Sequence, residues 1–262
     1  MDADVVTGRA VPESADLLSD FCGAVGQDLA QVATLHDAEA DAALIQSLKR
    51  SAFPVSLGMK LESKAGRDAL VLMKEALAGL PDSLDGQQVD ELAADYASIY
   101  LTHAYRASPS ESVWVDEEHL ERQESMFEVR ACYSRYGLGA ADWRKRADDH
   151  LVLQLQFLAH LFGREQPQQE LGTAARFMDE HLLRWLTPFA QRVAGRCATP
   201  FYAGVTLLTA SYCEELRDLL AAVLEAPRPA QEEIEARMQR TRLDRTPAVP
   251  VTFVPGAGGP SW

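Results

Sequence analysis

Two carboxylates and an imidazole are adjacent in the sequence at Asp148, Asp149 and His150, directly before the apolar run 151–162. A carboxylate beside a buried imidazole can act as an acid–base pair, because burial and a nearby charge both shift the pKa of histidine. With His160 on the same predicted helix, Asp149 and His150 also form the candidate site of an all-α metal protein or enzyme. The structural alternative is a helix cap, since aspartate at a helix start accepts unpaired backbone N–H groups.

Other motifs that carry enzyme chemistry are absent from the sequence. None of the six histidines has a glutamate three positions before it, which excludes the Glu-x-x-His pairs of di-metal helical bundles. The chain has no HExxH motif, no GxxxxGK[ST] loop and no GxSxG elbow. Its four cysteines form no CxxC pair, which favours free thiols in a reducing compartment. We therefore expect a cytoplasmic protein that is not an enzyme and holds no metal.

The run after His150 predicts a helix that is buried on all sides. Apolar residues cover most of its circumference, which is typical of a helix in the middle of a bundle. At roughly 100° per residue, Asp149, Gln156 and His160 fall on one stripe of this helix. His150 and Gln154 share a second stripe, so the few polar groups have defined directions. No apolar run reaches the roughly 18 residues that a membrane span needs, so no direct membrane insertion is expected.

Helical periodicity along most of the chain predicts an all-α fold, a multi-helix bundle built around the buried helix at about 147–163. Further helices are expected at 13–32, 38–52, 66–80, 87–103, 121–136, 168–193, 200–223 and 230–243. Pro188 is expected to kink the long helix that contains it. Gly137 is expected to end its helix in the left-handed conformation.

The pattern also predicts how the chain is divided into domains. We expect a single helical domain at 13–243, between a flexible N-terminus at 1–12 and a disordered or extended tail at 244–262. No segment alternates β-branched and polar residues as strands do. No internal repeat of fixed period is present.

The least regular stretch is 104–118, where AYRASPSESVWVDEE contains Pro109 and three serines. Loops of this length are uncommon inside compact helical domains unless they have a function. Its apolar residues Val113, Trp114 and Val115 have two interpretations. They either fill the core from outside or form the mobile apolar wall of a binding cleft.

The chain is acidic, with a formal net charge of −14. This charge argues against a nucleic-acid partner, because phosphate recognition needs a basic face. It favours a partner with a basic segment, with solubility alone as the alternative explanation. Six acidic residues between 116 and 128 crowd one helix start, where the helix dipole also explains them.

Four separated motifs carry a resemblance to a known family. DYASIY at 95–100 is similar to an aromatic-x-x-Leu-Phe helix end, and PSESVW at 109–114 to a Pro-x-x-Ser-Val-aromatic loop. DDHL at 148–151 is similar to the end of a Glu-Pro-x-Asp-His signature, and HLLRW at 181–185 to the helix after it. Together and in this order, they resemble the TorD/DmsD/NarJ group of redox-enzyme maturation chaperones, the TorD-like molybdoenzyme assembly chaperones. The resemblance extends from about residue 40 to 225.

The chain departs from the family pattern at three positions. Arg146 and Ala147 stand where the family usually has glutamate and proline, and Tyr100 replaces the more usual phenylalanine. The resemblance implies guanine nucleotide as a ligand of some members, and the charge reversal at Arg146 disfavours it here. No other cofactor is expected.

The resemblance implies an all-helical cytoplasmic chaperone. Such a protein binds the twin-arginine signal peptide, the apo form of a molybdenum-cofactor oxidoreductase catalytic subunit, or both, prevents premature export and assists cofactor insertion. The site that it implies consists of Tyr96, Ile99, Tyr100, Pro109, Trp114, Asp149 and His150. The aromatic residues, Ile99 and Pro109 are expected to form an apolar wall, and Asp149 a polar anchor for the peptide. The oligomeric state is left open between monomer and homodimer.

Overall fold

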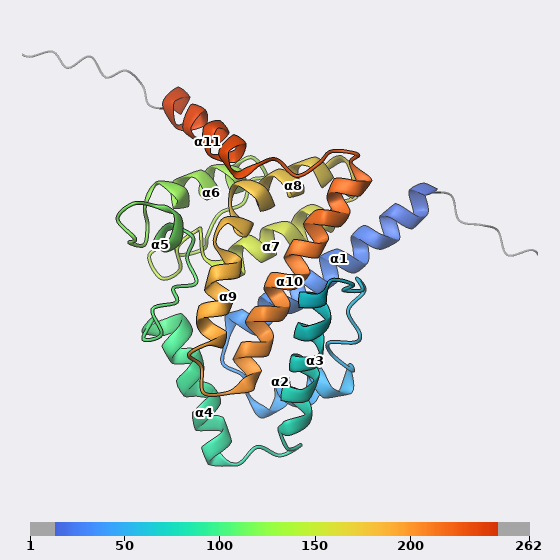
Figure 1. Cartoon of the computed structure of the whole chain (residues 1–262), viewed down its shortest axis with the longest axis vertical. Helices are drawn as coiled ribbons and strands as arrows, with labels where there is room; N and C mark the ends of the chain where they lie inside the picture. The colour runs from blue at the N-terminus through green and yellow to red at the C-terminus, as the bar shows by residue number, and fades with distance from the viewer. Residues whose placement is uncertain (1–13, 246–262) are drawn as a thin grey trace, which may run out of the picture. The chain divides into compact units, whose positions relative to one another are not determined.

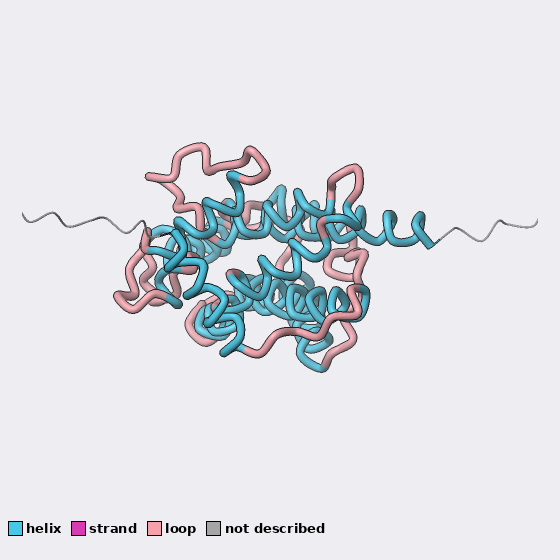
Figure 2. The backbone as a smooth tube through the Cα atoms, turned by 90° about the horizontal axis from the view of Figure 1, so that it is seen from above, coloured by secondary structure: helices cyan, strands magenta, loops and turns pink. Residues whose placement is uncertain are grey.

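The computed structural model describes residues 14–245, which form eleven α-helices and no β-strand within that range (Figures 1 and 2). The all-α prediction is therefore confirmed. The described residues up to Arg228 form one compact unit, and those from Pro229 form a second, which contains α11 (Gln231–Arg245). The expectations for 1–12 and for all but the first two residues of the predicted tail lie outside the described residues. Within 14–245, no helix has the length and apolar character needed to cross a membrane.

The first unit is a bundle of helices. Its helices are α1 (Ser14–Asp37), α2 (Ala42–Arg50), α3 (Lys64–Gly79), α4 (Gly86–Tyr96), α5 (Ser112–Val115), α6 (Glu124–Ser134), α7 (Leu151–Phe162), α8 (Leu171–Glu180), α9 (Leu186–Ala194) and α10 (Pro200–Val223). Helix α4 continues as a π-helical turn at Ala97–Leu101. Short 3-10 turns precede and follow α8, at Pro167–Gln169 and Leu182–Arg184.

Helix α7 is the buried helix that the sequence predicts. Its residues Leu151, Val152, Leu155, Leu158 and Leu161 have no exposed surface. The long helix α1 packs along it. Because a helix that is apolar on all sides needs neighbours on all sides, α7 fixes the arrangement of the helices around it.

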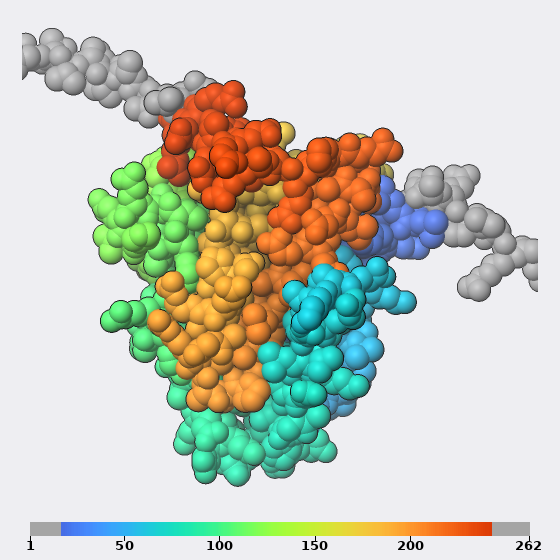
Figure 3. Space-filling model, in the orientation of Figure 1, coloured from blue at the N-terminus to red at the C-terminus, as the bar shows by residue number. Residues whose placement is uncertain are grey.

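Helix α10 lies between α3 and α9 (Figure 1), and its surface and that of α9 form much of the face seen in Figure 3. It approaches α3 closely at Gly204, where a Cβ atom would lie only 2.9 Å from the Met73 sulfur. The start of α10 is held by Asp95 of α4, whose carboxylate accepts hydrogen bonds from Ala198 N at 2.9 Å and Thr199 N at 2.7 Å. The buried Asp95 thereby satisfies backbone donors that a helix start leaves unpaired.

The prediction of one kinked helix at 168–193 is wrong, because the chain breaks there into α8 and α9. The break lies at His181–Trp185 and not at Pro188. His181 leaves the helical conformation with φ −127° and ψ −77° and turns its side chain into the interior. Pro188 is the third residue of α9, a position whose missing N–H would have no partner inside the helix. The prediction for Gly137 is confirmed, since its φ is +69°.

Candidate functional site

The loop that contains Pro109 is paired with the start of α7. Leu151 N donates to Pro109 O at 2.8 Å, and Glu111 N donates to Asp149 O at 3.2 Å. These bonds flank an isolated antiparallel bridge between Ser110 and His150. Two of the segments that the resemblance implies as a site are thus held together by backbone hydrogen bonds, although about forty residues separate them in sequence.

Asp149 is fully buried and binds the start of α5. Its Oδ2 accepts from Ser112 N at 2.8 Å, and its Oδ1 has no hydrogen-bond partner among the described residues. Burial raises the pKa of Asp149 to about 6, although the hydrogen bond from Ser112 opposes the shift; the negative Glu111 adds to it. The structural alternative is seen in altered form: the N-cap of α7 is His150, whose Nδ1 accepts from Val152 N at 3.2 Å, while Asp149 accepts from the start of α5.

His150 is nearly buried and electrically neutral. Burial lowers its pKa to about 3, and the positive charge of Arg146 adds to this effect. Since Nδ1 accepts a hydrogen bond, the ring proton is on Nε2. Arg146, which stands in place of the family's glutamate, forms an ion pair with Asp37 at the end of α1. Asp149 and His150 bind different partners, so they do not form an acid–base pair.

A buried polar cluster lies behind the loop, centred on Glu111. Its Oε1 is 3.1 Å from His181 Nδ1, and its Oε2 accepts from Gln154 Nε2 at 2.7 Å. Glu111 has no exposed surface and His181 only 3%. Neither residue was among the predicted site residues. Both fall inside motifs of the resemblance, at 109–114 and 181–185, which is the signal by which they could have been found.

Tyr96, Ile99 and Tyr100 are buried in the core. Tyr96 donates to Asp37 O at 2.8 Å, and its ring lies 4.8 Å from that of Tyr100. Tyr100 OH is 2.6 Å from His36 Nδ1 on α1. These side chains therefore join α1 to the end of α4 and present little surface to solvent.

The buried His36 joins this group to α10. Its Nε2 lies 2.8 Å from Thr209 Oγ1, whose own proton is donated to Val205 O at 2.7 Å. His36 Nε2 must then be the donor to Thr209, so Nδ1 accepts from Tyr100. Burial lowers the pKa of His36 to about 3 and keeps it in this neutral form.

Trp114 is the most exposed of the predicted site residues and lines an open pocket of about 610 Å³. We call this cavity the Trp114 pocket; it is lined by His103, Arg106, Ser108, Val113, Trp114, His119, Leu120, Glu121 and Arg192. The Arg192 guanidinium lies 4.4 Å from the centre of the Trp114 ring and donates to Arg106 O. Figure 3 shows the surface of this part of the chain (green) beside that of α9. Both interpretations of the loop apply in part: Val113 and Trp114 line the pocket, while Trp114 and Val115 also pack against the core.

The backbone around the Trp114 pocket is strained. His103, Arg106, His119 and Arg122 have φ angles of 51° to 64°, although none is glycine. Left-handed conformations of such residues cost on the order of 1 kcal/mol each and concentrate at functional sites. The surrounding contacts therefore hold this segment in a shape that it would not adopt alone.

The structure gives no support to a metal site at Asp149, His150 and His160. Residues 14–245 contain no group of three or more histidine, cysteine, aspartate or glutamate side chains that could hold a metal ion. His160 lies near the other end of α7, with its ring 6.1 Å from that of Tyr136.

Comparison with known proteins gives consistent matches. Residues 64–191, which include every predicted site residue, match the family described as nitrate reductase delta subunit. Chaperone protein TorD of Vibrio cholerae serotype O1 is 29% identical over 176 residues, which cover 64% of this chain and 78% of that protein. Chaperone protein TorD of Vibrio parahaemolyticus is 28% identical, over 64% of this chain and 80% of its own length. That of Photobacterium profundum is 28% identical, over 62% and 76%.

The names of these relatives indicate a kind of function. Each is named a chaperone, a role that is not enzymatic, in agreement with the expectation that this protein is not an enzyme. The segment matched by the family model, 64–191, contains the motifs at 95–100, 109–114, 148–151 and 181–185. The resemblance read from these motifs is confirmed: the chain is similar to the TorD/NarJ-type chaperones.

Proposed function

We propose that this protein is a cytoplasmic chaperone for the maturation of a molybdenum-cofactor oxidoreductase. The family match and the names of its relatives support the general role. We infer that it binds the twin-arginine leader of the catalytic subunit and delays export while the cofactor is inserted. The free state of Cys22, Cys132, Cys197 and Cys213 supports a reducing compartment.

The observation that carries the proposal is Trp114 at the wall of an open pocket. Tryptophan is enriched among residues that anchor protein partners, because it offers a large rigid apolar surface. Leu120 lines the same pocket and is 56% exposed, and Val113 adds a third apolar side chain. An apolar segment of a leader peptide would cover all three.

The charges around the pocket define an orientation for the peptide. Arg106 and Arg192 lie within the pocket, where they would repel the basic part of a leader, and the one carboxylate in the lining, Glu121, already forms an ion pair with Arg122. Glu117 and Glu118 are exposed directly after α5 and would attract it. The basic part is therefore expected against these two glutamates, with the apolar part in the pocket.

The buried residues of the predicted site would act by positioning the loop. Asp149 holds the start of α5 through Ser112 N, and α7 holds Pro109 O. Because Asp149 has no exposed surface, its carboxylate cannot meet a peptide without a rearrangement of the loop. Tyr96, Ile99 and Tyr100 would support the same region from the core.

The test is a titration of a fluorescent twin-arginine leader peptide against wild type and Trp114→Ala. Removing a tryptophan anchor is expected to weaken binding by at least about tenfold, since such anchors contribute about 2 kcal/mol. Trp143→Ala is the matched control, because Trp143 is 40% exposed and does not line the Trp114 pocket. No binding by wild type, or equal losses in the two variants, would refute the proposal.

The role of Asp149 is tested by comparing two substitutions. Asp149→Ala removes the acceptor of Ser112 N, so the loop loosens and leader binding weakens. Asp149→Asn keeps an acceptor and should retain binding. If the carboxylate instead contacts the arginines of the leader, both variants lose binding to the same extent.

A further inference from the structure

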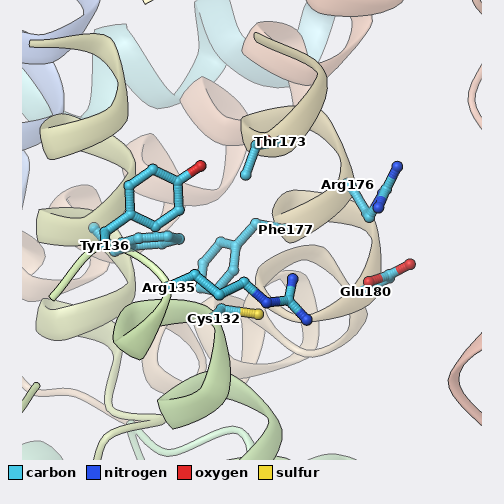
Figure 4. A pocket seen from close by; sticks show the side chains of 8 residues that line it. Cys132, Arg135, Tyr136, Thr173, Arg176, Phe177 and Glu180 are labelled. Carbon is cyan, nitrogen blue, oxygen red and sulfur yellow. The ribbon is translucent and has the colours of Figure 1, made fainter. Parts of the chain in front are cut away.

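A second pocket lies between α6, α7 and α8 and shares no lining residue with the Trp114 pocket (Figure 4). We call it the Cys132 pocket. Its volume is about 320 Å³, at the lower end of the range for small-molecule sites. The rings of Tyr136, Phe157 and Phe177 provide its apolar lining, and the Cys132 thiol opens into it.

The Cys132 thiol has a charged partner behind it. Its Sγ lies 3.8 Å from His181 Nε2, and His181 Nδ1 lies 3.1 Å from Glu111 Oε1. Burial would lower the pKa of His181, but Glu111 and Cys132 together raise it, so the ring is protonated at neutral pH. The Cys132 sulfur therefore has a positively charged imidazole at hydrogen-bond distance.

The other three cysteines lack this combination of exposure and a positive partner. Cys22 and Cys213 have no exposed surface. Cys197 is half-buried, and burial with the nearby negative Asp95 raises its pKa to about 11. Within 14–245, Cys132 is the cysteine with a histidine at hydrogen-bond distance.

Two arginines give the mouth of the Cys132 pocket a positive charge. Arg135 and Arg176 line it and are exposed, and no ion pair joins either of them to a carboxylate among the described residues. The half-buried Glu180 lines the pocket as well, so two arginines and one glutamate leave the lining with a net positive charge. In Figure 4 the Arg135 guanidinium and the Cys132 sulfur point to the same side of the pocket. The chain as a whole has a formal net charge of −14, so a thiol that opens beside an arginine, in a pocket with a net positive lining, differs from the average charge of the protein.

We propose that Cys132 is a site of reversible mixed-disulfide formation with an anionic peptide disulfide of the glutathione class. The carboxylates of the small disulfide would pair with Arg135 and Arg176, and its uncharged part would lie against the aromatic lining. This inference concerns a modification of the chain and does not depend on the proposed client.

The reaction is a thiol–disulfide exchange. The Cys132 thiolate attacks one sulfur of the small disulfide, and a bond forms from Sγ to that sulfur as the original S–S bond breaks. The displaced thiolate takes up the proton that Cys132 gave up. The small disulfide is the oxidant: its displaced half leaves as a free thiol, and Cys132 is oxidised to the mixed disulfide. Excess reduced thiol reverses the exchange.

The test is incubation of the full chain with glutathione disulfide, followed by intact mass measurement and peptide mapping. One adduct is expected, on Cys132, with Cys197 modified far more slowly. Cys132→Ser should abolish it, and excess reduced glutathione should reverse it. Modification that is spread equally over Cys132 and Cys197 would overturn the proposal.

The contribution of the arginines is tested with two disulfides of opposite charge. Arg135→Ala/Arg176→Ala should slow the reaction with glutathione disulfide about fivefold, since each exposed ion pair contributes less than about 1 kcal/mol. The same variant should not slow the reaction with the cationic disulfide cystamine. Arg50→Ala/Lys60→Ala removes the same charge at exposed positions elsewhere and should leave both rates unchanged. Equal slowing with both disulfides would contradict recognition by charge.

The role of the histidine is measured separately. His181→Gln removes the positive partner of Cys132 and should slow the reaction with both disulfides at neutral pH. Circular dichroism establishes that this variant is folded. If it does not fold, the arginine variants still decide the proposal. Unchanged rates in a folded His181→Gln protein would show that the imidazole does not activate the thiol.

Discussion

Glu111 and His181 form a buried ion pair between residues 70 positions apart, with Oε1 3.1 Å from Nδ1. Glu111 belongs to the loop that carries Trp114, and His181 to the break between α8 and α9. The break in the helix at His181 and the contact of its imidazole with the carboxylate occur at the same residue. On its other side the same imidazole contacts Cys132, so one ion pair supports both pockets.

We predict that Glu111→Gln lowers the free energy of unfolding at pH 7 by about 3 kcal/mol, since it removes one charge of a buried pair. The pKa of His181 is raised from 6.5 to about 10 in the folded state. The stabilisation is therefore complete below about pH 6.5 and is lost as pH rises toward 10. Urea unfolding should show a smaller difference in the free energy of unfolding between wild type and variant at pH 9 than at pH 7.

The matched control for Glu111→Gln is the other buried ion pair, Asp179 with Arg217 at 2.8 Å. Arginine does not titrate in this range. Asp179→Asn should therefore cost a similar amount at both pH values. A Glu111→Gln difference that is as large at pH 9 as at pH 7 would contradict a protonated His181.

Asp149→Asn is expected to stabilise the protein at neutral pH. The carboxyl has a pKa of about 6 when folded against 3.8 as its ordinary value, so the folded state binds its proton more tightly. Its contribution to stability is largest below about pH 4 and is lost as pH rises to 6, a difference of about 2 to 3 kcal/mol. The asparagine should unfold at higher urea than wild type at pH 7 and at the same urea at pH 4.

Asp148→Asn is the control for this prediction and should have the opposite sign. The Asp148 carboxylate accepts two hydrogen bonds from Arg130, at 3.0 and 2.7 Å. Loss of its charge should cost about 2 kcal/mol at pH 7, as for hydrogen bonds to charged groups. If both asparagine variants lower the free energy of unfolding at pH 7, the charged form of Asp149 does not destabilise the folded protein.

Features that depend on residues close together in the chain could be predicted from the sequence. The apolar circumference of 151–162 predicts a buried helix, and the structure places α7 there with its apolar residues covered. Gly137 could be assigned to a helix end because its conformation depends on one residue. The separate partners of Asp149 and His150 follow from helix geometry, in which adjacent residues point in different directions.

What the sequence could not predict depends on partners that are distant in the chain. At the break, His181 pairs with Glu111, which lies 70 positions away, and the apolar periodicity of 168–193 does not indicate such a partner. The sequence does not show that His150 is the N-cap of α7, because the carboxylate of Asp149 accepts a hydrogen bond from Ser112 N of α5. The sequence does not show that Trp114 is partly exposed and Tyr100 buried, because both are aromatic residues within the motifs of the resemblance.

Tyr100→Phe restores the residue that the family usually has and is expected to destabilise this protein. The change leaves His36 Nδ1, which accepts from Tyr100 OH at 2.6 Å, buried without a partner. An unsatisfied buried acceptor costs about 1 to 3 kcal/mol. Thermal or urea unfolding measures the loss, and Tyr136→Phe, which removes a hydroxyl near the surface, should cost less. Equal stability of Tyr100→Phe and wild type would show that the hydrogen bond contributes nothing net.

The last prediction concerns the acidic residues beside the Trp114 pocket. Glu117→Gln/Glu118→Gln should weaken binding of the twin-arginine leader about fivefold at low salt, because exposed charge pairs contribute less than about 1 kcal/mol each. The variant should also bind with a weaker salt dependence than wild type, since screening has fewer charges to act on. Fluorescence titrations at two ionic strengths measure both effects.

The control for this variant removes two exposed carboxylates elsewhere, in Glu75→Gln/Asp90→Asn on α3 and α4. It has the same net charge as the test variant, so a general effect of charge would weaken leader binding equally in both. Local attraction at Glu117 and Glu118 predicts a loss in the test variant alone. A leader whose arginines are replaced by glutamine should bind wild type and the test variant alike, because the glutamates then have no cation to attract. If that peptide still distinguishes the two proteins, the glutamates act on the shape of the loop and not on the basic part of the leader.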